Sequence, residues 1–309
     1  LEDKSALGYI TAIIALTAGS SFFMWIGERI NEKGVGNGIS VVLVINIIST
    51  IPQDIVGLFS QFVVGKDIAP AILNSIIIIA VLIALIVLIV LLNSGVRKIP
   101  VQYAKKMQGR KMVGGNSSNI PLKINTSGVI PVIFAVAFLS VPSFVGQVIQ
   151  RKDPNSQIAE NLISWFSAPS ASNYNVYTGL TYKDYIYPAC YFVLVIIFTY
   201  IYTSIMYNTQ DYAENLQKQG GFIEGVRPGK QTEKYFSNIM NRLNLFGSVS
   251  LGIIALLPYI VDFISIKILG TPLGLSISGT SLLIVVTVAI ENIRTLNSRA
   301  LMVTYDEYK

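Results

Sequence analysis

The stretch Ala71–Leu92, AILNSIIIIAVLIALIVLIVLL, decides the fold class of this chain. Only Asn74 and Ser75 interrupt its run of apolar residues. A helix needs about 20 mostly apolar residues to cross a bilayer, because the hydrocarbon core is about 30 Å thick. At about 1.5 Å per residue the stretch reaches about 33 Å. It therefore predicts a membrane-spanning helix.

Other parts of the chain share this apolar character. The predicted spans are 8–27, 39–60, 71–93, 127–147, 186–206, 245–264 and 276–292. Of the 309 residues 52% are hydrophobic and only 13% are charged, whereas soluble domains are about 25% charged. The sequence therefore predicts an all-α, polytopic transmembrane helix bundle. Pro52 and Asp54 interrupt the second span and predict a short helix with an interfacial end, and Pro131 and Pro142 favour bending of the fourth.

The distribution of basic residues predicts the orientation. The net charge is +6, and this excess could suggest a nucleic-acid partner. Of the 23 lysines and arginines, however, 17 fall in segments on the side of the chain's last residue. Because basic residues collect on the cytoplasmic side of membrane proteins, we expect the first residue outside and the last residue inside. This bias explains the basic character without nucleic acid.

Two long polar segments on the inner side are candidate functional loops. The segment 94–125 has a strand-like piece from Val96 to Tyr103, followed by a turn-rich stretch near Gly114. It therefore predicts a basic β-hairpin. The segment 207–243 begins with a helical pattern over Thr209–Leu216 and breaks at Gly220. An outer loop, 148–183, is rich in Ser, Asn and Tyr, and we expect it to lie on the membrane face.

The residue types present argue against an enzyme. The chain has no histidine, and its one cysteine, Cys190, lies in an apolar run. We expect no catalytic site, no metal and no cofactor. The chain begins at Leu1 without a methionine or a basic leader, so we expect that it was cut upstream.

Three features with a possible binding role have simpler explanations. The run Gly34-Val35-Gly36-Asn37-Gly38 matches no phosphate-binding pattern and joins two predicted spans, so Gly34, Gly36 and Gly38 predict a structural turn. Asn46 and Glu291 are the intramembrane polar candidates. A lone Asn more often bonds a neighbouring helix, and Glu291 is close enough to the inner end to reach the interface.

Several motifs resemble one known family. Trp25–Ile30 (WIGERI) followed by Lys33–Ser40 (KGVGNGIS) resembles the signature between the fourth and fifth spans of the SecY family of protein-conducting channel subunits. The remaining matches are Gln102–Lys105, Gly109–Lys111, Leu122–Asn125, Gly128–Pro131, Ala213–Leu216, Gly225–Gly229 and Gly279–Val286. The resemblance covers nearly the whole chain, in order. It implies that the seven spans correspond to family spans four to ten, with 1–70 the last two spans of an N-terminal half and 71–309 a complete C-terminal half.

The resemblance also implies roles for single residues. A pore ring of aliphatic side chains would comprise Ile39, Leu43, Ile133 and Ile284, although an isolated isoleucine is usually a core residue. Arg110, Lys111 and Arg227 would dock a soluble partner, the SecA motor or the ribosome. The family often has two arginines at the hairpin tip, and here Lys111 lacks the bidentate geometry of Arg. The outer loop 148–183 is also longer than the family leads us to expect.

The function implied is passive conduction of unfolded polypeptides that carry a signal sequence or a membrane segment. Spans 127–147 and 186–206 resemble the mobile half of a lateral gate towards lipid. The partners implied are SecE, SecG, SecA and the ribosome, in a bacterial plasma membrane. Two rivals stay open: a secondary transporter of small solutes, which should show midplane polar groups, and a membrane enzyme, which would need a clustered nucleophile and base.

Overall fold

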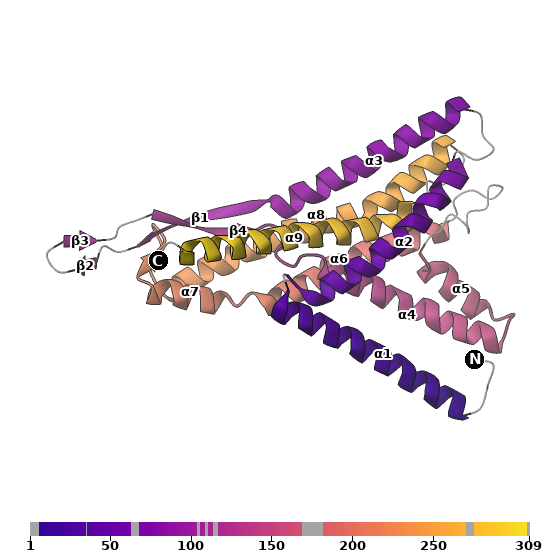
Figure 1. Cartoon of the computed structure of the whole chain (residues 1–309), viewed down its shortest axis with the longest axis horizontal. Coiled ribbons are helices and arrows are strands. Elements are labelled where there is room, and N and C mark those ends of the chain that lie inside the picture. Colours follow the sequence, from indigo (N-terminus) through magenta and orange to yellow (C-terminus); the bar gives the residue numbers. More distant parts are fainter. Residues whose placement is uncertain are drawn as a thin grey trace. The chain divides into compact units, whose positions relative to one another are not determined.

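The fold is known from a computed structural model that describes residues 6–34, 36–62, 68–103, 106–108, 111–113, 117–168, 182–269 and 275–307. The chain forms two compact units, one of residues 1–75 with 284–309 and one of residues 76–283. Figure 1 labels their elements. The predicted division at residue 70 follows the halves of the family and stays a prediction.

The first unit is built on a helical hairpin. Helices α1 (Ala6–Lys33) and α2 (Gly38–Phe62) pack against each other and are joined by residues 34–37. Pro52 lies inside α2 without ending it, and the helix has 25 residues, so the prediction of a short helix is wrong. The unit also contains the start of α3 (Ile68–Ser94) and most of α9 (Leu275–Glu307).

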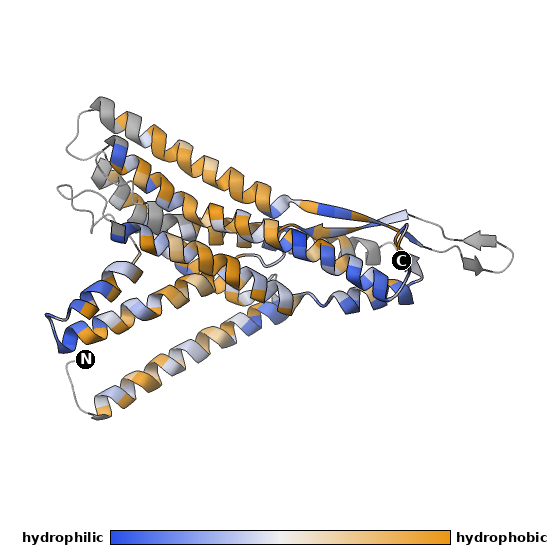
Figure 2. Cartoon of the chain, turned by 180° about the vertical axis from the view of Figure 1, so that it is seen from behind, coloured by the Kyte–Doolittle hydropathy of each residue, from blue (hydrophilic) through white to orange (hydrophobic). Residues whose placement is uncertain are grey.

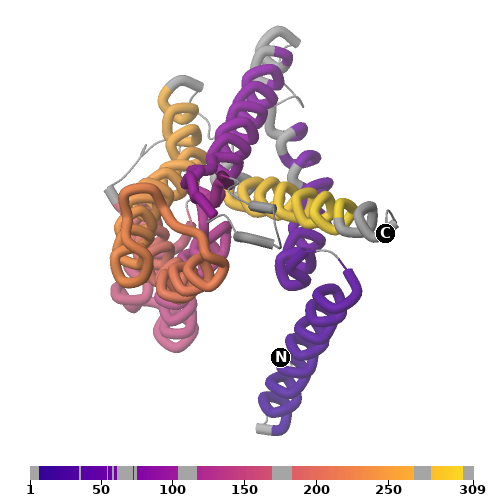
Figure 3. Tube along the Cα trace, turned by 90° about the vertical axis from the view of Figure 1, so that its left-hand side faces the viewer, coloured from indigo at the N-terminus to yellow at the C-terminus, as the bar shows by residue number. Residues whose placement is uncertain are grey.

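The second unit centres on a bundle of apolar helices. Helix α6 (Ile186–Met206) packs against both α4 (Ile130–Lys152) and α8 (Lys230–Leu269), and the three helices lie together in Figure 3. Tyr187 and Tyr191 of α6 and Tyr259 of α8 bring their rings within 5.8–6.2 Å of one another. All three side chains are buried, so a knot of aromatic rings joins the two helices.

The predicted membrane spans correspond closely to the helices. By length and composition, six helical stretches of the described residues could cross a membrane, and they contain the first six predicted windows or most of each. The seventh window, 276–292, lies within α9, whose first side chains fall outside the described residues. Figure 2 shows α3 hydrophobic along most of its described length and more hydrophilic colouring in the strand that follows.

The predicted β-hairpin is confirmed. Strand β1 (Val96–Tyr103) pairs antiparallel with β4 (Ser117–Lys123) from Val96↔Lys123 to Gln102↔Ser117. At the far end of the hairpin a second ladder joins β2 (Lys106–Gln108) to β3 (Lys111–Val113). Strand β5 (Gly221–Phe222) adds to β1, so the sheet order is β4-β1-β5 and the two predicted loops form one structure.

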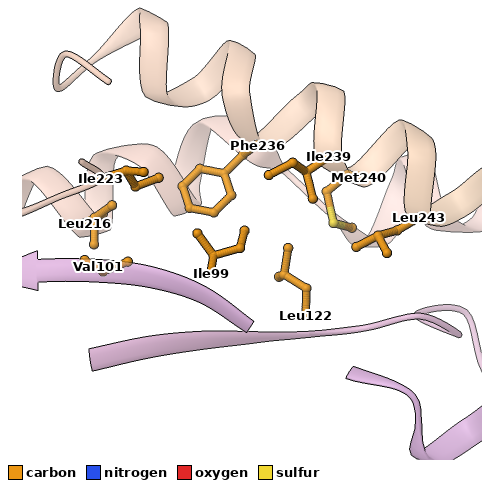
Figure 4. Packing of buried hydrophobic residues seen from close by; sticks show 9 residues of the cluster. All are labelled: Ile99, Val101, Leu122, Leu216, Ile223, Phe236, Ile239, Met240 and Leu243. Atoms are coloured by element: carbon orange, nitrogen blue, oxygen red, sulfur yellow. The ribbon is translucent and has the colours of Figure 1, made fainter. Parts of the chain in front are cut away.

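A buried apolar core, here called the hairpin cluster, joins the sheet to two helices (Figure 4). It consists of Ile99, Val101, Leu122, Leu216, Ile223, Phe236, Ile239, Met240 and Leu243. Alternate residues of β1 supply the inward face, as the two-residue period of a strand requires. Helix α7 (Thr209–Lys218) and the first turns of α8 cover this face, and the beginning of α7 confirms the predicted helical pattern.

Besides the length of α2, the structure departs from the sequence predictions at two places. Helix α8 begins at Lys230, so the predicted loop 207–243 ends fourteen residues earlier than its apolar pattern indicated. The predicted outer loop 148–183 contains the end of α4 and a further helix, α5 (Gln157–Phe166), which packs back along α4. Gly146 allows this contact, because a Cβ there would lie 2.9 Å from Ile163 and 3.0 Å from Leu162. Ser143 and Ser167 also hydrogen-bond at 3.0 Å, and residues 169–181 lie outside the described residues.

Candidate functional site

An apolar groove between α1 and α2 contains two of the predicted pore-ring residues. Ile39 and Leu43 line it, and the cavity has a volume of about 700 Å³. The other lining residues are Phe23, Met24, Ile26, Ile30, Val42, Ile45, Asn46 and Ser49. Ile39 is 56% exposed. Because only Asn46 and Ser49 are polar and no lining residue is charged, the groove offers hydrated ions almost no compensation for lost water.

The glycine turn (residues 34–38) sets the start of α2. The amide of Gly38 donates to Oδ1 of Asn31 at 2.7 Å. Oδ1 of Asn37 accepts from the amides of Ile39 at 3.1 Å and Ser40 at 3.4 Å. These side chains satisfy amides that a helix start would otherwise leave unpaired, so the first residues of α2 are held by the segment that precedes them.

Close backbone contact between α1 and α2 depends on two glycines. A Cβ on Gly38 would collide with the carbonyl oxygen of Gly27, and a Cβ on Gly27 would lie 3.3 Å from Cγ1 of Ile39. Gly36 has φ +84°, a left-handed conformation that glycine adopts without a Cβ penalty. Gly36 and Gly38 therefore each have a distinct structural reason to be glycine.

Two residues of α9 contact the glycine turn, and no sequence pattern predicts either contact. The guanidinium of Arg299 donates to the carbonyl oxygen of Gly34, 265 residues away in the chain. The side-chain oxygen of Asn292 lies where a Cβ of Gly36 would be. No local pattern links residues this far apart, so only the fold could reveal them.

The other two predicted ring residues, Ile133 and Ile284, lie in helices α4 and α9. Ile133 stands in the first turn of α4, in the second unit, and is half-buried. Ile284, also half-buried, belongs to the part of α9 that lies in the first unit. Ile39 and Leu43 thus share one groove, and the four-residue ring stays a prediction.

Arg227 stands on a turn that the hairpin cluster supports. Gly225 and Gly229, on either side, have φ +80° and +99°. The hydroxyl of Thr232 donates to the Arg227 carbonyl at 3.0 Å, and Thr232 is buried. The Arg227 side chain is exposed, so a fixed backbone presents a solvent-accessible positive charge. Of the other two predicted docking residues, Arg110 lies outside the described residues and Lys111 is described only as part of strand β3.

A buried polar junction at the base of the hairpin was not predicted as a unit. Nδ2 of Asn125 donates to Oδ1 of Asn93 at 2.9 Å, and Nδ2 of Asn93 donates to the Ile89 carbonyl at 3.1 Å. The hydroxyl of Ser127 donates to Oδ1 of Asn125 at 3.4 Å. All three polar side chains are buried. The junction therefore ties the last turn of α3 to the segment between β4 and α4.

The predicted gate helices contact each other through aromatic side chains. Phe198 of α6 lies 6.0 Å from Phe134 and 5.9 Å from Phe138 of α4, between ring centroids. Beside them a second apolar cavity of about 420 Å³ lies between α4, α5 and α6. It is lined by Phe138, Leu139, Pro142, Phe166, Ala189, Cys190, Val193 and Leu194.

Catalytic chemistry finds little support in the described part of the chain. No group of three His, Cys, Asp or Glu side chains there could hold a metal ion. Asn46 and Glu291, the intramembrane polar candidates, are both exposed and belong to different helices, α2 and α9. The geometry offers apolar cavities and an exposed arginine on a supported turn.

Comparison with known sequences gives one consistent result. A family model described as SecY matches residues 2–293. The protein translocase subunit SecY of Staphylococcus carnosus is 37% identical over 308 residues, covering 99% of this chain and 66% of that protein. The protein translocase subunit SecY of Bacillus licheniformis is 38% identical over 310 residues, with the same coverage of 99% and 66%. The chain therefore spans just under two thirds of the length of these relatives.

Solved structures show the same fold. One, described as "The structure of a protein conducting channel", has a TM-score of 0.58 at 20% identity and aligns with 91% of this chain and 63% of its own. Another, on the plug domain of the SecY protein and the closed state of the translocation channel, has the same TM-score and identity and aligns with 64% of its own chain.

Proposed function

Since the chain belongs to the SecY family, we propose that it is the central pore-forming subunit of a preprotein translocase. It conducts unfolded secretory polypeptides across a membrane and releases membrane segments sideways into lipid. The chain makes and breaks no bond in this reaction. It is a conduit, and the energy comes from a motor, a ribosome or the membrane potential.

The observation that carries this proposal is the apolar groove at the start of α2. Ile39 and Leu43 lie on it, and no charged side chain lines it. A ring of branched apolar side chains, completed by Ile133 and Ile284, resists hydration and so blocks ions. The same side chains are flexible enough to part around a polypeptide. A solute transporter would instead place polar or charged groups at such a waist.

The basic surface is the proposed docking site for the partner that supplies the polypeptide. Arg227 is exposed on a turn held by Thr232. Lys111 belongs to strand β3 of the hairpin, and Arg110 precedes it in the sequence. Positive charge at these positions attracts acidic protein surfaces and RNA phosphates. The proposed partners are accordingly the SecA motor and the ribosome, with SecE and SecG as membrane subunits.

The proposed location is a bacterial plasma membrane, with the hairpin and Arg227 on the cytoplasmic side. The positive-inside bias supports this orientation. Helices α4 and α6, which meet at Phe198, form the mobile side of the proposed lateral gate. Pro142 inside α4 supports bending there, since proline removes a helix hydrogen bond.

The test is an import assay with the complete natural protein in inverted vesicles, supplied with SecE, SecA, ATP and a signal-bearing substrate. We expect protease-protected product from the unaltered protein. We expect Arg227→Glu to reduce import at least about tenfold, because reversing a docking charge turns attraction into repulsion. The measurement is the fraction of substrate that survives added protease.

The matched control is Lys218→Glu, a charge reversal on another exposed side chain of the same region. It should leave import close to normal if Arg227 acts as a directed contact. An equal loss of import in both variants would mean that Arg227 contributes only to the overall positive charge and makes no specific contact. Failure of the unaltered protein to import any signal-bearing substrate, with the complex intact, would remove the translocase proposal and favour a solute transporter.

A further inference from the structure

We propose that Arg299 and Asn292 of α9 are positioning residues that hold the glycine turn and thereby set the start of the pore helix α2. This inference rests on the proposed function, because it concerns the closed state of the proposed pore. It goes beyond that function by assigning a role to two residues of the last helix that line neither of the two cavities described above. All the contacts concerned lie within the first unit.

The contact of Arg299 has a clear physical basis. The last carbonyl groups of a helix have no intrahelical partner and carry a partial negative charge. Gly34 immediately follows α1, and its amide still donates to the Ile30 carbonyl at 2.7 Å. Its own carbonyl accepts from Nη1 of Arg299. A guanidinium thus completes the end of α1 from a distant helix, through a charge-assisted hydrogen bond.

Asn292 restrains the turn at a second point. Its side-chain oxygen occupies the space next to Gly36 that any other residue would need for a Cβ. Gly36 has φ +84°, so the backbone there is already in a conformation that favours glycine. Asn292 and Arg299 are seven residues apart, which places them about two turns apart on the same face of α9. Gly34 and Gly36 are therefore both contacted from one face of α9.

Movement of this turn cannot be separated from movement of α2. Asn31 and Asn37 bind the first amides of α2 from within the same segment. Ile39 follows at once, and Leu43 comes about one turn later on the same groove. A shift of the glycine turn along α9 would therefore shift both proposed ring residues by a similar amount.

Helix α9 carries a proposed ring residue of its own. Ile284 precedes Asn292 by about two turns on the continuous helix Leu275–Glu307. The contacts of α9 with the glycine turn therefore fix the relative position of α2 and α9, which both contribute residues to the proposed ring. If Arg299 were only a solvated surface charge, its removal would leave α2 in place relative to α9. If it holds the glycine turn, its removal should let α2 shift.

The first test measures the position of α2 directly. Cys190 is the only cysteine in the 309 residues, so Cys190→Ser, with any cysteine outside these residues also changed to Ser, gives a background in which Leu43→Cys is the sole thiol. We expect Arg299→Met to change the rate at which a membrane-impermeant maleimide labels that thiol about three- to tenfold, the range that loss of one charge-assisted bond at an exposed site allows. Arg299→Lys, which keeps a donor, should restore much of the original rate.

The matched control is Arg29→Met, which removes another basic residue whose ion pair, 3.0 Å to Glu32, stays on its own helix. It should leave the labelling rate unchanged. Ion leak through idle channels in vesicles gives a second readout, and we expect a similar rise in leak for Arg299→Met alone. A merely structural residue would lower the amount of folded protein without changing either readout per folded channel.

The outcomes separate the two proposals. Unchanged labelling and leak in Arg299→Met, with import intact in the unaltered protein, would overturn the positioning role and leave the translocase function standing. Altered labelling in a protein that imports nothing would support the grip on α2 while removing the pore function. Equal changes in Arg299→Met and Arg29→Met would also overturn the proposal, because they would point to charge alone.

Discussion

Gly38 shows at the scale of one residue how tightly the first unit is specified. Its Cα faces the Gly27 carbonyl so closely that no larger residue fits without moving the backbone. A displaced backbone cannot relax by rotating a side chain, so the cost falls on the packing of α1 against α2. The same contact positions Ile39 next to Gly27.

We predict that Gly38→Ala destabilises the first unit by about 1–3 kcal/mol, the usual cost of forcing extra atoms into a close contact. The check is the midpoint of thermal unfolding of the purified protein in detergent, followed with a probe in α1. Gly19→Ala is the control, because a Cβ at Gly19 meets no atom within 4 Å. Alanine improves helix propensity there, so its midpoint should stay or rise. Equal midpoints for the two variants would contradict the close contact.

Single residues also mark the limit of sequence-based prediction. The glycine turn could be predicted, since three glycines within five residues between two apolar windows leave few other structures. The Arg299–Gly34 contact could not, because it joins positions 265 residues apart. The support of the Arg227 turn by the hydroxyl of Thr232 likewise needed the structure.

Helix α8 carries the lesson at the scale of an element. Its apolar pattern begins near residue 245, yet the helix begins at Lys230. Hydropathy changes where a helix enters the membrane, and the backbone has no reason to change there. The first turns of α8 instead bury Phe236, Ile239 and Met240 in the hairpin cluster. One continuous helix therefore runs from the hairpin cluster into the bundle of the second unit.

We predict that Phe236→Ala loosens the hairpin cluster and leaves the membrane helices folded. Phe236 is 2% exposed, and truncating a buried Phe typically costs about 3–5 kcal/mol. Limited proteolysis should show faster cleavage in residues 207–229 and in the hairpin, with the spans still protected. The control is Phe246→Ala on the same helix, whose side chain is 59% exposed. Faster cleavage in the control alone, or in neither variant, would contradict the cluster's role.

Helix α5 was missed for a related reason. Its ten residues, QIAENLISWF, are too short for a span and stand beside a segment rich in Ser, Asn and Tyr. Composition therefore favoured a loop. The contact of Gly146 with Leu162 and Ile163 and the Ser143–Ser167 hydrogen bond show that the segment packs back along α4. Small residues that let helices approach closely are common where helices meet in membranes.

At the scale of the whole molecule, the proposed orientation separates two exposed regions of the second unit. Glu224 lies beside the Arg227 turn, and Asn155 lies between α4 and α5; both side chains are exposed. An odd number of crossings separates the two regions, because α6 is the one apolar span between them among the residues that the structure describes. They should therefore face opposite sides of the membrane.

We predict that an impermeant maleimide added to intact cells labels Asn155→Cys and spares Glu224→Cys, each in the Cys190→Ser background. In inverted vesicles the pattern should reverse, since the positive-inside rule places the more basic segments in the cytoplasm. Labelling after detergent treatment controls for thiol reactivity. Labelling of both thiols from one side would mean that α6 does not cross, and the reverse pattern would invert the orientation.

The buried junction of Asn93, Asn125 and Ser127 has a mechanical consequence. It fastens the end of α3 to the segment leading into α4, at the base of a hairpin whose tip, β2 and β3, lies far along the ladder (Figure 1). A force applied at that tip is transmitted through this junction to two membrane helices at once. The hairpin then acts as a lever with a rigid base, and pushing on it displaces α3 and α4 as a pair.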